Sequence, residues 1–492
     1  MRPSLVFTPI VLLFLGLTIF PRTVNGQVSA YASPRVLANT QQATNDRVAP
    51  IVNRAINALG GEEALNAKQF RVMYLGTRDL NVVHQGRFPG RPMPSRKQDT
   101  LIIDVDGHRA VMRSEQINSD GSPSIWRSGV LNDTAYLWNL KTGLKFPRSP
   151  QAVWLDFRLR IPQVVLQELR QHLKELSFKG TEFVDGRAHD VLLYAADNAE
   201  AFKVLFDRAT GQLTGYEFDT TDLFGKTLRY VLFKTYKSFT NLERFPSGLK
   251  TVIGSQVYED FDVVYATTGT VASDEWLKPL PEDLRAPSVT KHPRAITELK
   301  PGIYQLSNVN GRNAFAADLG DSLAVVDAPS QDASRIIIEM LREKLPGKPI
   351  RYVIPTHHHD DHIGGIKDFA AVGATVVTSP GNVAFVKKIL RAANPQLAPK
   401  LEIVNDRRVF GDGKSQLEIY RLEGGFHTFE TLVAYFPAYG IVFEADVSDY
   451  HVDAKHFLDF AFRRNLKIEQ IYRAHSFGPT TLADWESDEP GN

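Results

Sequence analysis

The fold is decided by the stretch Thr356-His357-His358-His359-Asp360-Asp361-His362-Ile363-Gly364-Gly365, which contains the pattern His-x-His-x-Asp-His. Directly before it, Arg351-Tyr352-Val353-Ile354-Pro355 is apolar and contains two adjacent β-branched residues, which is typical of a buried strand. A strand that ends in such a turn holds imidazoles and a carboxylate around one point, as a metal site requires. The alternative interpretation is a histidine-rich surface loop, but the predicted strand before the motif favours the metal site.

Three further segments downstream combine an apolar strand pattern with a candidate ligand. His427 follows Gly424-Gly425-Phe426 and precedes the apolar run 432–436. Asp446 ends the apolar run that starts at Ile441, and His475 ends the segment that starts at Ile468. Folds of alternating strands and helices place their chemistry at strand ends. We therefore expect these side chains to lie at the same edge as the first motif.

In these motifs the chain from about Leu299 to residue 480 resembles the metallo-β-lactamase-fold hydrolases. The resemblance implies an αββα sandwich that begins with strands at 302–306, 314–317 and 322–327 and a helix at 334–345. It also implies two metal sites that share one carboxylate. The expected ligands are His357, His359 and His427 at one site, Asp361, His362 and His475 at the other, and Asp446 between them. His358 and Asp360 occupy variable positions of the motif and are expected to point away towards the surface, with a supporting role beside the metal ligands as the alternative.

Imidazole and carboxylate ligands without any thiolate suit Zn²⁺, so two Zn²⁺ ions are expected, with Fe and Mn left open. The chain contains no cysteine, which excludes the β-lactamase type with a cysteine ligand. Zinc-bound water ionises near pH ~7, so a bridging hydroxide is available to attack a carbonyl. Asp361 is the candidate catalytic residue, because it would bind metal and orient that hydroxide. The predicted activity is hydrolysis of an ester, thioester, lactone or amide.

Three other functions are left open. A mononuclear iron oxygenase would use His357, His359 and His427 on the same fold. A non-catalytic ligand-binding protein of the cell envelope would need no metal. A serine esterase would use Ser322 in Gly320-Asp321-Ser322-Leu323 with the block Asp453-Ala454-Lys455-His456. The strand pattern after Ser322 argues against the esterase, because a nucleophilic serine of this type should begin a helix.

Residues 45–282 predict a separate β-rich domain, joined by a proline-containing linker at 283–298 to the catalytic domain at 299–480, with a tail at 481–492. A helix is expected at 47–59, and Gly60-Gly61 would end it. A second helix is expected at 163–176, among antiparallel strands. The motif Asn57-Ala58-Leu59-Gly60-Gly61 and the rhythm of strands and turns resemble the lipoprotein-carrier half-barrels. Such a half-barrel would hold an acyl chain or serve as a scaffold, and scaffolding is the preferred prediction.

The N-terminus predicts export. Arg2 and the apolar run 5–20 are typical of a secretory signal peptide within residues 1–30, and an uncleaved anchor is the alternative. We expect a secreted or periplasmic mature chain without a membrane span. The formal net charge of +1 and the absence of a long basic run argue against nucleic-acid binding. A small-molecule substrate is therefore expected, and the oligomeric state is left open.

Overall fold

The computed structural model describes residues 46–117, 123–140, 145–195, 201–269, 277, 293–394, 396, 400–447, 451–476 and 478–487. The predicted signal peptide at 1–30 and most of the predicted linker lie outside these residues. In the part of the chain that is described, no helix combines the length and the apolar character that a membrane span needs.

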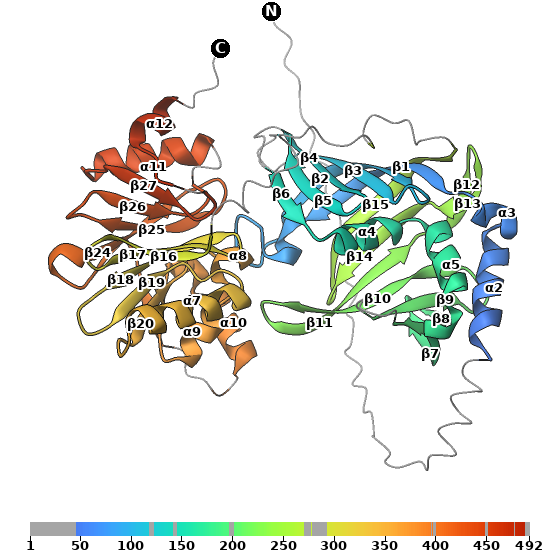
Figure 1. The fold of residues 1–492 in the computed structure, drawn as a ribbon, viewed down its shortest axis with the longest axis horizontal. Helices are drawn as coiled ribbons and strands as arrows, with labels where there is room; N and C mark the ends of the chain where they lie inside the picture. Colours follow the sequence, from blue (N-terminus) through green and yellow to red (C-terminus); the bar gives the residue numbers. More distant parts are fainter. Residues whose placement is uncertain are drawn as a thin grey trace, which may run out of the picture. The chain divides into compact units, whose positions relative to one another are not determined.

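The N-terminal part is built on one antiparallel sheet, in which thirteen strands are described (Figure 1). Strands β1 to β6 lie side by side in chain order, and so do β7 to β11. β14 and β15 lie between these two runs: β14 pairs with β11, and β15 pairs with β1. The strands of the sheet are β1 Gln69–Asp79, β2 Pro94–Asp104, β3 Arg109–Ile117, β4 Pro123–Leu131, β5 Thr134–Asn139, β6 Lys145–Arg148, β7 Leu176–Val184, β8 Arg187–Tyr194, β9 Phe202–Asp207, β10 Leu213–Asp222, β11 Gly225–Phe233, β14 Gly248–Ile253 and β15 Gln256–Thr268. β12 Tyr236–Phe239 and β13 Leu242–Pro246 form a separate hairpin. The predicted antiparallel β domain is confirmed.

Helices cover one face of this sheet and enclose its core. They are α2 Val48–Leu59, α3 Glu62–Leu65, α4 Pro150–Arg158 and α5 Pro162–Gln171, with the short 3₁₀ turn η2 Leu173–Glu175 after α5. A further 3₁₀ turn, η1 Leu80–Val83, lies in the connection between β1 and β2. α2 begins one residue after the predicted start and ends at Gly60, which has a φ of 120° that favours glycine. The predicted helix at 163–176 is shorter than expected and continues as η2. Apolar side chains from α2 and α5 pack with those of the central strands into one core.

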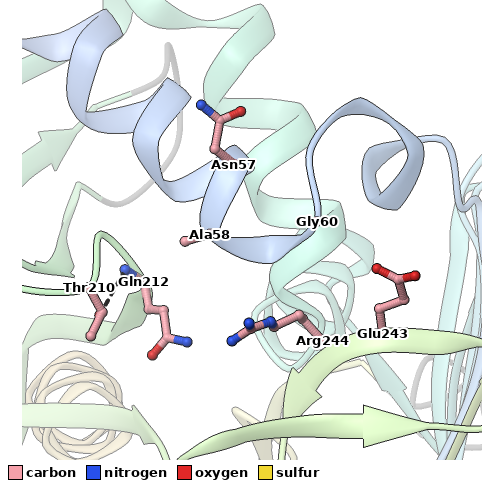
Figure 2. Close-up of a pocket in the computed structure, with 7 residues that line it drawn as sticks. All are labelled: Asn57, Ala58, Gly60, Thr210, Gln212, Glu243 and Arg244. Carbon is pink, nitrogen blue, oxygen red and sulfur yellow. Dashed lines mark hydrogen bonds between the residues drawn. The ribbon is translucent and has the colours of Figure 1, made fainter.

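A pocket of about 400 Å³ opens beside the end of α2 (Figure 2). Its lining residues are Asn57, Ala58, Gly60, Thr210, Gln212, Glu243 and Arg244. Most of these side chains are polar or charged, and an acyl chain requires an apolar lining. The pocket at the Asn57–Gly61 motif therefore does not favour lipid binding over the preferred scaffold role.

The core of the N-terminal sheet also contains a group of buried charges. Lys97 Nζ lies 2.9 Å from Asp99 Oδ2 and 3.5 Å from Glu259 Oε1. Arg160 contacts the same two carboxylates at 3.9 Å and 3.6 Å. Each of the four side chains is at most 7 % exposed, so their charges are compensated by one another rather than by solvent.

The C-terminal part contains two sheets packed face to face (Figure 1). The first sheet consists of β16 Ala295–Lys300, β17 Ile303–Val309, β18 Arg312–Asp318, β19 Leu323–Val326, β20 Ile350–Ile354, β21 Thr375–Thr378 and β22 Leu401–Ile403. The second consists of β23 Arg407–Phe410, β24 Leu417–Glu423, β25 Glu430–Phe436, β26 Ile441–Glu444 and β27 Gln470–Arg473. β16 pairs with β17, so the first sheet begins four residues before the predicted boundary at 299.

Helices flank both sheets of this sandwich. α7 Gln331–Lys344, α9 Ile366–Ala371 and α10 Val383–Ala393 pack on the first sheet. α11 His451–Arg463 and α12 Leu482–Ser487 pack on the second. A third apolar cluster, which includes Phe315 and Phe443, lies between the sheets. The remaining short elements are α8 Asp360–Ile363, η5 Pro380–Asn382 and η6 Gly413–Ser415. The predicted αββα sandwich is confirmed.

Candidate metal centre

The histidine-rich motif follows β20, as its apolar pattern predicts. The chain leaves the strand at Ile354, passes His357 and His359, and forms the single turn α8. α8 is followed by a glycine pair that lies against α7. A Cβ on Gly365 would lie 1.8 Å from Ser334 Oγ, and one on Gly364 would lie 2.4 Å from the carbonyl oxygen of Asp360. The two glycines therefore allow a close approach that any larger residue would obstruct.

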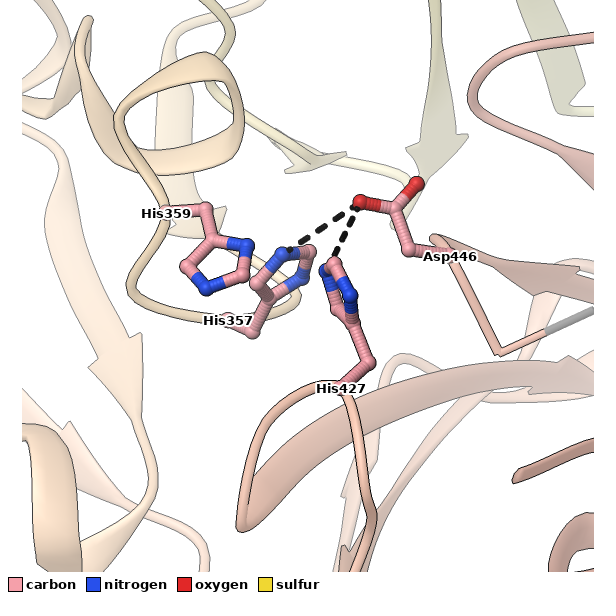
Figure 3. A group of neighbouring side chains, drawn as sticks. All are labelled: His357, His359, His427 and Asp446. Carbon is pink, nitrogen blue, oxygen red and sulfur yellow. Dashed lines mark ion pairs between the residues drawn. The ribbon is translucent and has the colours of Figure 1, made fainter. Parts of the chain in front are cut away.

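The structure brings all seven predicted ligands together, in two groups that each lie within 4.8 Å. One group is His357, His359, His427 and Asp446, and the other is Asp361, His362 and His475. They come from four loops, which follow β20, β24, β26 and β27. Strand ends from both sheets meet at this edge, as the sequence predicts. Figure 3 shows the first group, with the three imidazoles gathered around the Asp446 carboxylate.

Asp446 lies between the two groups. Its Oδ2 lies 3.1 Å from His427 Nε2 and 3.2 Å from His362 Nε2. Its Oδ1 lies 2.8 Å from His475 Nε2. Burial alone would raise the pKa of Asp446, but His475 and His362 outweigh it and hold that pKa well below the usual range. The backbone φ of Asp446 is 64°, in the left-handed region, and this conformation turns the chain directly after β26.

Asp327, at the end of β19, fixes the orientation of His362. Asp327 Oδ2 lies 2.6 Å from His362 Nδ1, and both side chains are fully buried. Burial would lower the pKa of His362, but Asp327, Asp361 and Asp446 outweigh it and raise that pKa. Because Nδ1 faces Asp327, Nε2 is directed at the second group, 3.5 Å from Asp361 Oδ2 and 3.0 Å from His475 Nε2. From the sequence, Asp327 is recognisable only as the end of a predicted strand, and no local pattern reveals its contact with His362.

His357 and His359 are buried neutral imidazoles. Burial is the main cause that holds the pKa of each well below its ordinary value, and neighbouring imidazoles lower it further. His359 Nε2 lies 3.0 Å from the Gly86 carbonyl oxygen. Among the described residues, His359 Nδ1 and His357 Nε2 have no hydrogen-bond partner. Buried polar nitrogens are rarely left in this state, and both point into the first group.

The loop that carries His427 is held by Asp453 of α11. The carboxylate of Asp453 accepts hydrogen bonds from the backbone amides of Phe426, at 2.5 Å, and His427, at 2.6 Å. Asp453 itself is 4 % exposed. Two amides converging on one buried carboxylate fix the direction in which His427 leaves the chain. This role of Asp453 is not apparent from the sequence, in which the residue stands out only as part of the serine-esterase block.

Two expectations for the first motif are wrong. His358 does not point to the surface: it is 2 % exposed, and its Nε2 lies 2.7 Å from the Gly86 carbonyl oxygen. Asp360 accepts a hydrogen bond of 2.5 Å from Gln85. Both positions face a loop of the N-terminal part that the motif alone does not reveal.

The structure does not favour the serine-esterase alternative. Ser322 is 2 % exposed and directly precedes β19, and its hydroxyl donates to Asp321 at 2.8 Å. His456, on α11, lies 2.8 Å from the Glu423 carbonyl oxygen. Ser322 therefore lies at a strand start, whereas a nucleophilic serine of this type begins a helix.

Part of the C-terminal sandwich matches a known sequence family. Residues 308–447 match the sequence model of the metallo-beta-lactamase superfamily. A linear primary-alkylsulfatase from Pseudomonas sp. is 32 % identical over 71 residues, which are 14 % of this chain and 10 % of that protein. The chain therefore spans only a small share of this relative's length.

Solved structures that are similar to part of this chain include a metallo-beta-lactamase and an alkylsulfatase. A metallo-beta-lactamase from Pontibacter korlensis is 18 % identical, with a TM-score of 0.32, and the match covers 39 % of this chain and 95 % of that chain. A stereoselective inverting sec-alkylsulfatase from Pseudomonas sp. is 16 % identical, with a TM-score of 0.32, and the match covers 39 % of this chain and 41 % of that chain.

Proposed function

We propose that the chain is a hydrolase that uses two divalent metal ions, preferably Zn²⁺. The observation that carries the proposal is the pair of ligand groups on either side of Asp446. One ion would be held by His357, His359 and His427, and the other by Asp361, His362 and His475. Asp446 would contribute to both. The match to the metallo-beta-lactamase superfamily model over residues 308–447 supports the same conclusion.

The donor set fits divalent zinc. The imidazoles of His357 and His359 are neutral, as metal ligands must be, and their unpartnered buried nitrogens are explained if a cation accepts their lone pairs. Imidazole and carboxylate ligands without thiolate also suit Zn²⁺. When bound, such ions acidify water and polarise a carbonyl or phosphoryl oxygen.

The protein residues prepare this chemistry. His362, Arg312 and His475 outweigh burial and the repulsion from Asp446, and hold the pKa of Asp361 below its usual range, so Asp361 stays a carboxylate. Arg312 Nη2 lies 3.0 Å from Asp361 Oδ2 and restrains this carboxylate from one side. A fixed, ionised Asp361 can accept a hydrogen bond from an attacking water and orient it. We assign Asp361 this catalytic role in addition to metal binding.

The proposed substrates are small carbonyl compounds: esters, thioesters, lactones or amides. Alkyl sulfates are a second candidate, because the relative that shares 32 % identity over 71 residues is an alkylsulfatase. Both classes require attack of water on an electrophilic centre whose oxygens gain charge, which the same site could support.

We further propose that residues 1–30 direct export to the periplasm or the medium. N-terminal sequencing of the mature protein from each cell fraction would test this.

Metal content and activity test the function together. Elemental mass spectrometry of the full chain is expected to give about two Zn per chain, and about one for His362→Ala. The loaded protein is then assayed with a p-nitrophenyl ester, a thioester, a lactone, an anilide and an alkyl sulfate. One tightly held Fe would favour the oxygenase, and a chain without tightly held metal would favour the binding protein. Either result would overturn the proposal.

A further inference from the structure

The connection between β1 and β2 of the N-terminal sheet reaches the candidate ligands. It comprises Leu80–Met93, and we call it the 80–93 loop. Its fold is local: Asp79 Oδ1 accepts hydrogen bonds from the amides of Asn81, at 3.0 Å, and Met93, at 2.8 Å, and so ties the two ends together. The tip of the loop, at Gln85 and Gly86, therefore projects as a fixed unit.

Gln85 contacts the ligand set through its side-chain amide. Its Nε2 donates to Asp361 Oδ1 at 3.0 Å and to Asp360 Oδ1 at 2.5 Å. Carboxylates only accept hydrogen bonds, so the amide nitrogen, and not the amide oxygen, must face them. Gln85 thereby holds one oxygen of Asp361, Oδ1, while Arg312 Nη2 contacts the other, Oδ2, at 3.0 Å. Oδ2 also faces His362 Nε2 at 3.5 Å and His475 Nε2 at 3.6 Å.

Gly86 contacts two histidines of the motif through its carbonyl oxygen. This oxygen lies 2.7 Å from His358 Nε2 and 3.0 Å from His359 Nε2. Since a carbonyl only accepts, His359 must carry its proton on Nε2, which leaves the lone pair of Nδ1 directed at the first group. The 80–93 loop thus contacts ligands of both groups.

The loop is anchored on the sandwich beside the ligands. The Phe429 amide donates to the Arg87 carbonyl oxygen at 3.0 Å, and Arg87 Nε donates to the Gly425 carbonyl oxygen at 3.0 Å. Phe88 stacks on Phe429 with ring centroids 5.0 Å apart. These contacts fix the loop without touching the ligand side chains, so anchoring and ligand orientation can be separated by mutation.

We propose that Gln85 is a positioning residue of the second metal site, supplied by the N-terminal part of the chain. This inference rests on the proposed function. The Gln85 amide holds Asp361 Oδ1 so that Oδ2 is aimed at the cation held with His362 and His475. Mutation of a residue that hydrogen-bonds to a metal ligand typically lowers metal affinity or activity 10- to 100-fold. The N-terminal sheet is accordingly part of the metal centre and not only a scaffold beside it.

The test uses the full chain with Gln85→Met, which keeps the length of the side chain and removes its donor. The affinities of the two sites for Zn²⁺ are measured by chelator competition, and the visible spectrum is recorded after loading with Co²⁺. We expect the ion of the site formed by Asp361, His362 and His475 to be lost about 10- to 100-fold more readily than in the wild type, with an altered Co²⁺ spectrum. The first ion should keep its affinity, because the Gly86 carbonyl is unchanged.

Phe88→Leu is the matched control, since it weakens the anchor and leaves the Gln85 amide in place. It should retain both ions and the wild-type Co²⁺ spectrum. Equal losses in Phe88→Leu and Gln85→Met would overturn the inference, because they would trace the effect to loop placement. If Gln85→Met kept the wild-type Zn²⁺ affinity and Co²⁺ spectrum, the positioning role of Gln85 would be overturned, while the proposed function would stand. A wild-type chain that binds no metal would overturn the proposed function as well.

Discussion

Asp327 and His362 form a fully buried carboxylate–imidazole pair, with Asp327 Oδ2 2.6 Å from His362 Nδ1. The same carboxylate accepts hydrogen bonds from Thr356, through its amide at 3.2 Å and its hydroxyl at 2.9 Å. Asp327 therefore connects the end of β19 to the start of the histidine motif. It fixes both the direction of the loop and the nitrogen that His362 presents to the second group.

Asp327→Asn is predicted to weaken the second metal site. The amide keeps the size of the side chain but removes the charge that orients the imidazole, so we expect a 10- to 100-fold loss of affinity for the second ion. Chelator competition with the full chain measures it. Asp332→Asn is the control. Asp332 lies close to Asp327 in the sequence, at the start of α7, but its side chain is 82 % exposed. Unchanged affinity in Asp327→Asn would refute the orienting role.

Asp361→Ala is predicted to abolish most turnover while the chain stays folded. Loss of a group that orients the attacking water typically costs about 10²- to 10⁴-fold, and loss of a metal ligand adds to this. Turnover of the best substrate and far-UV circular dichroism measure the two effects. Ser322→Ala is the control and should retain activity. A large loss in Ser322→Ala, with activity retained in Asp361→Ala, would instead favour the serine esterase.

Much of the C-terminal domain could be predicted from the sequence because its signals are local. The apolar run before Pro355 predicts β20, and the ligands follow strand ends at short, fixed spacings. The contacts made by Gln85 and Gly86 could not be predicted, because they join residues about 270 positions apart. The loop around Gln85 carries no motif. His358 and Asp360 were misassigned for the same reason, since their partners lie on that loop.

The sequence predicts that the N-terminal sheet is antiparallel, but it does not predict the order of its strands. Alternating apolar residues and turn residues such as Asp106-Gly107-His108 indicate antiparallel strands, and β2 and β3 flank this turn. The order of the strands depends on the pairing of β1 with β15, which are almost two hundred residues apart. No local pattern specifies such a pairing. α4 was also missed, since its nine residues have only Val153 and Phe157 buried.

Gly365→Ala is predicted to destabilise the C-terminal domain. The new methyl group would lie 1.8 Å from Ser334 Oγ and 2.2 Å from Ser334 Cβ, so the start of α9 must move away from α7. Overpacking of this kind costs about 1–3 kcal/mol in the free energy of unfolding. Urea denaturation of the single variants and of Gly365→Ala with Ser334→Gly measures the coupling. Recovery of stability in the double variant is expected, and strictly additive losses would contradict the steric explanation.

Glu259→Gln is predicted to destabilise the N-terminal sheet in a pH-dependent manner. Burial would raise the pKa of Glu259, but Lys97, Arg160 and Arg78 outweigh it and lower the pKa from 4.5 to about 2. A lowered pKa means that the ionised carboxylate stabilises the folded state above pH 4.5, and that this contribution disappears as the pH falls towards 2. The shift corresponds to about 3 kcal/mol at pH 7.

The measurement is urea denaturation of wild type and Glu259→Gln between pH 7 and pH 3. The difference in the free energy of unfolding should be about 3–5 kcal/mol at pH 7, because the variant leaves buried cations uncompensated. It should fall by about 2 kcal/mol at pH 3, where the wild-type carboxylate has lost more than half of its stabilising contribution. Glu243→Gln, on an exposed part of β13, should show no such trend. A difference for Glu259→Gln that stays constant with pH would show that Glu259 acts through packing and not through its charge.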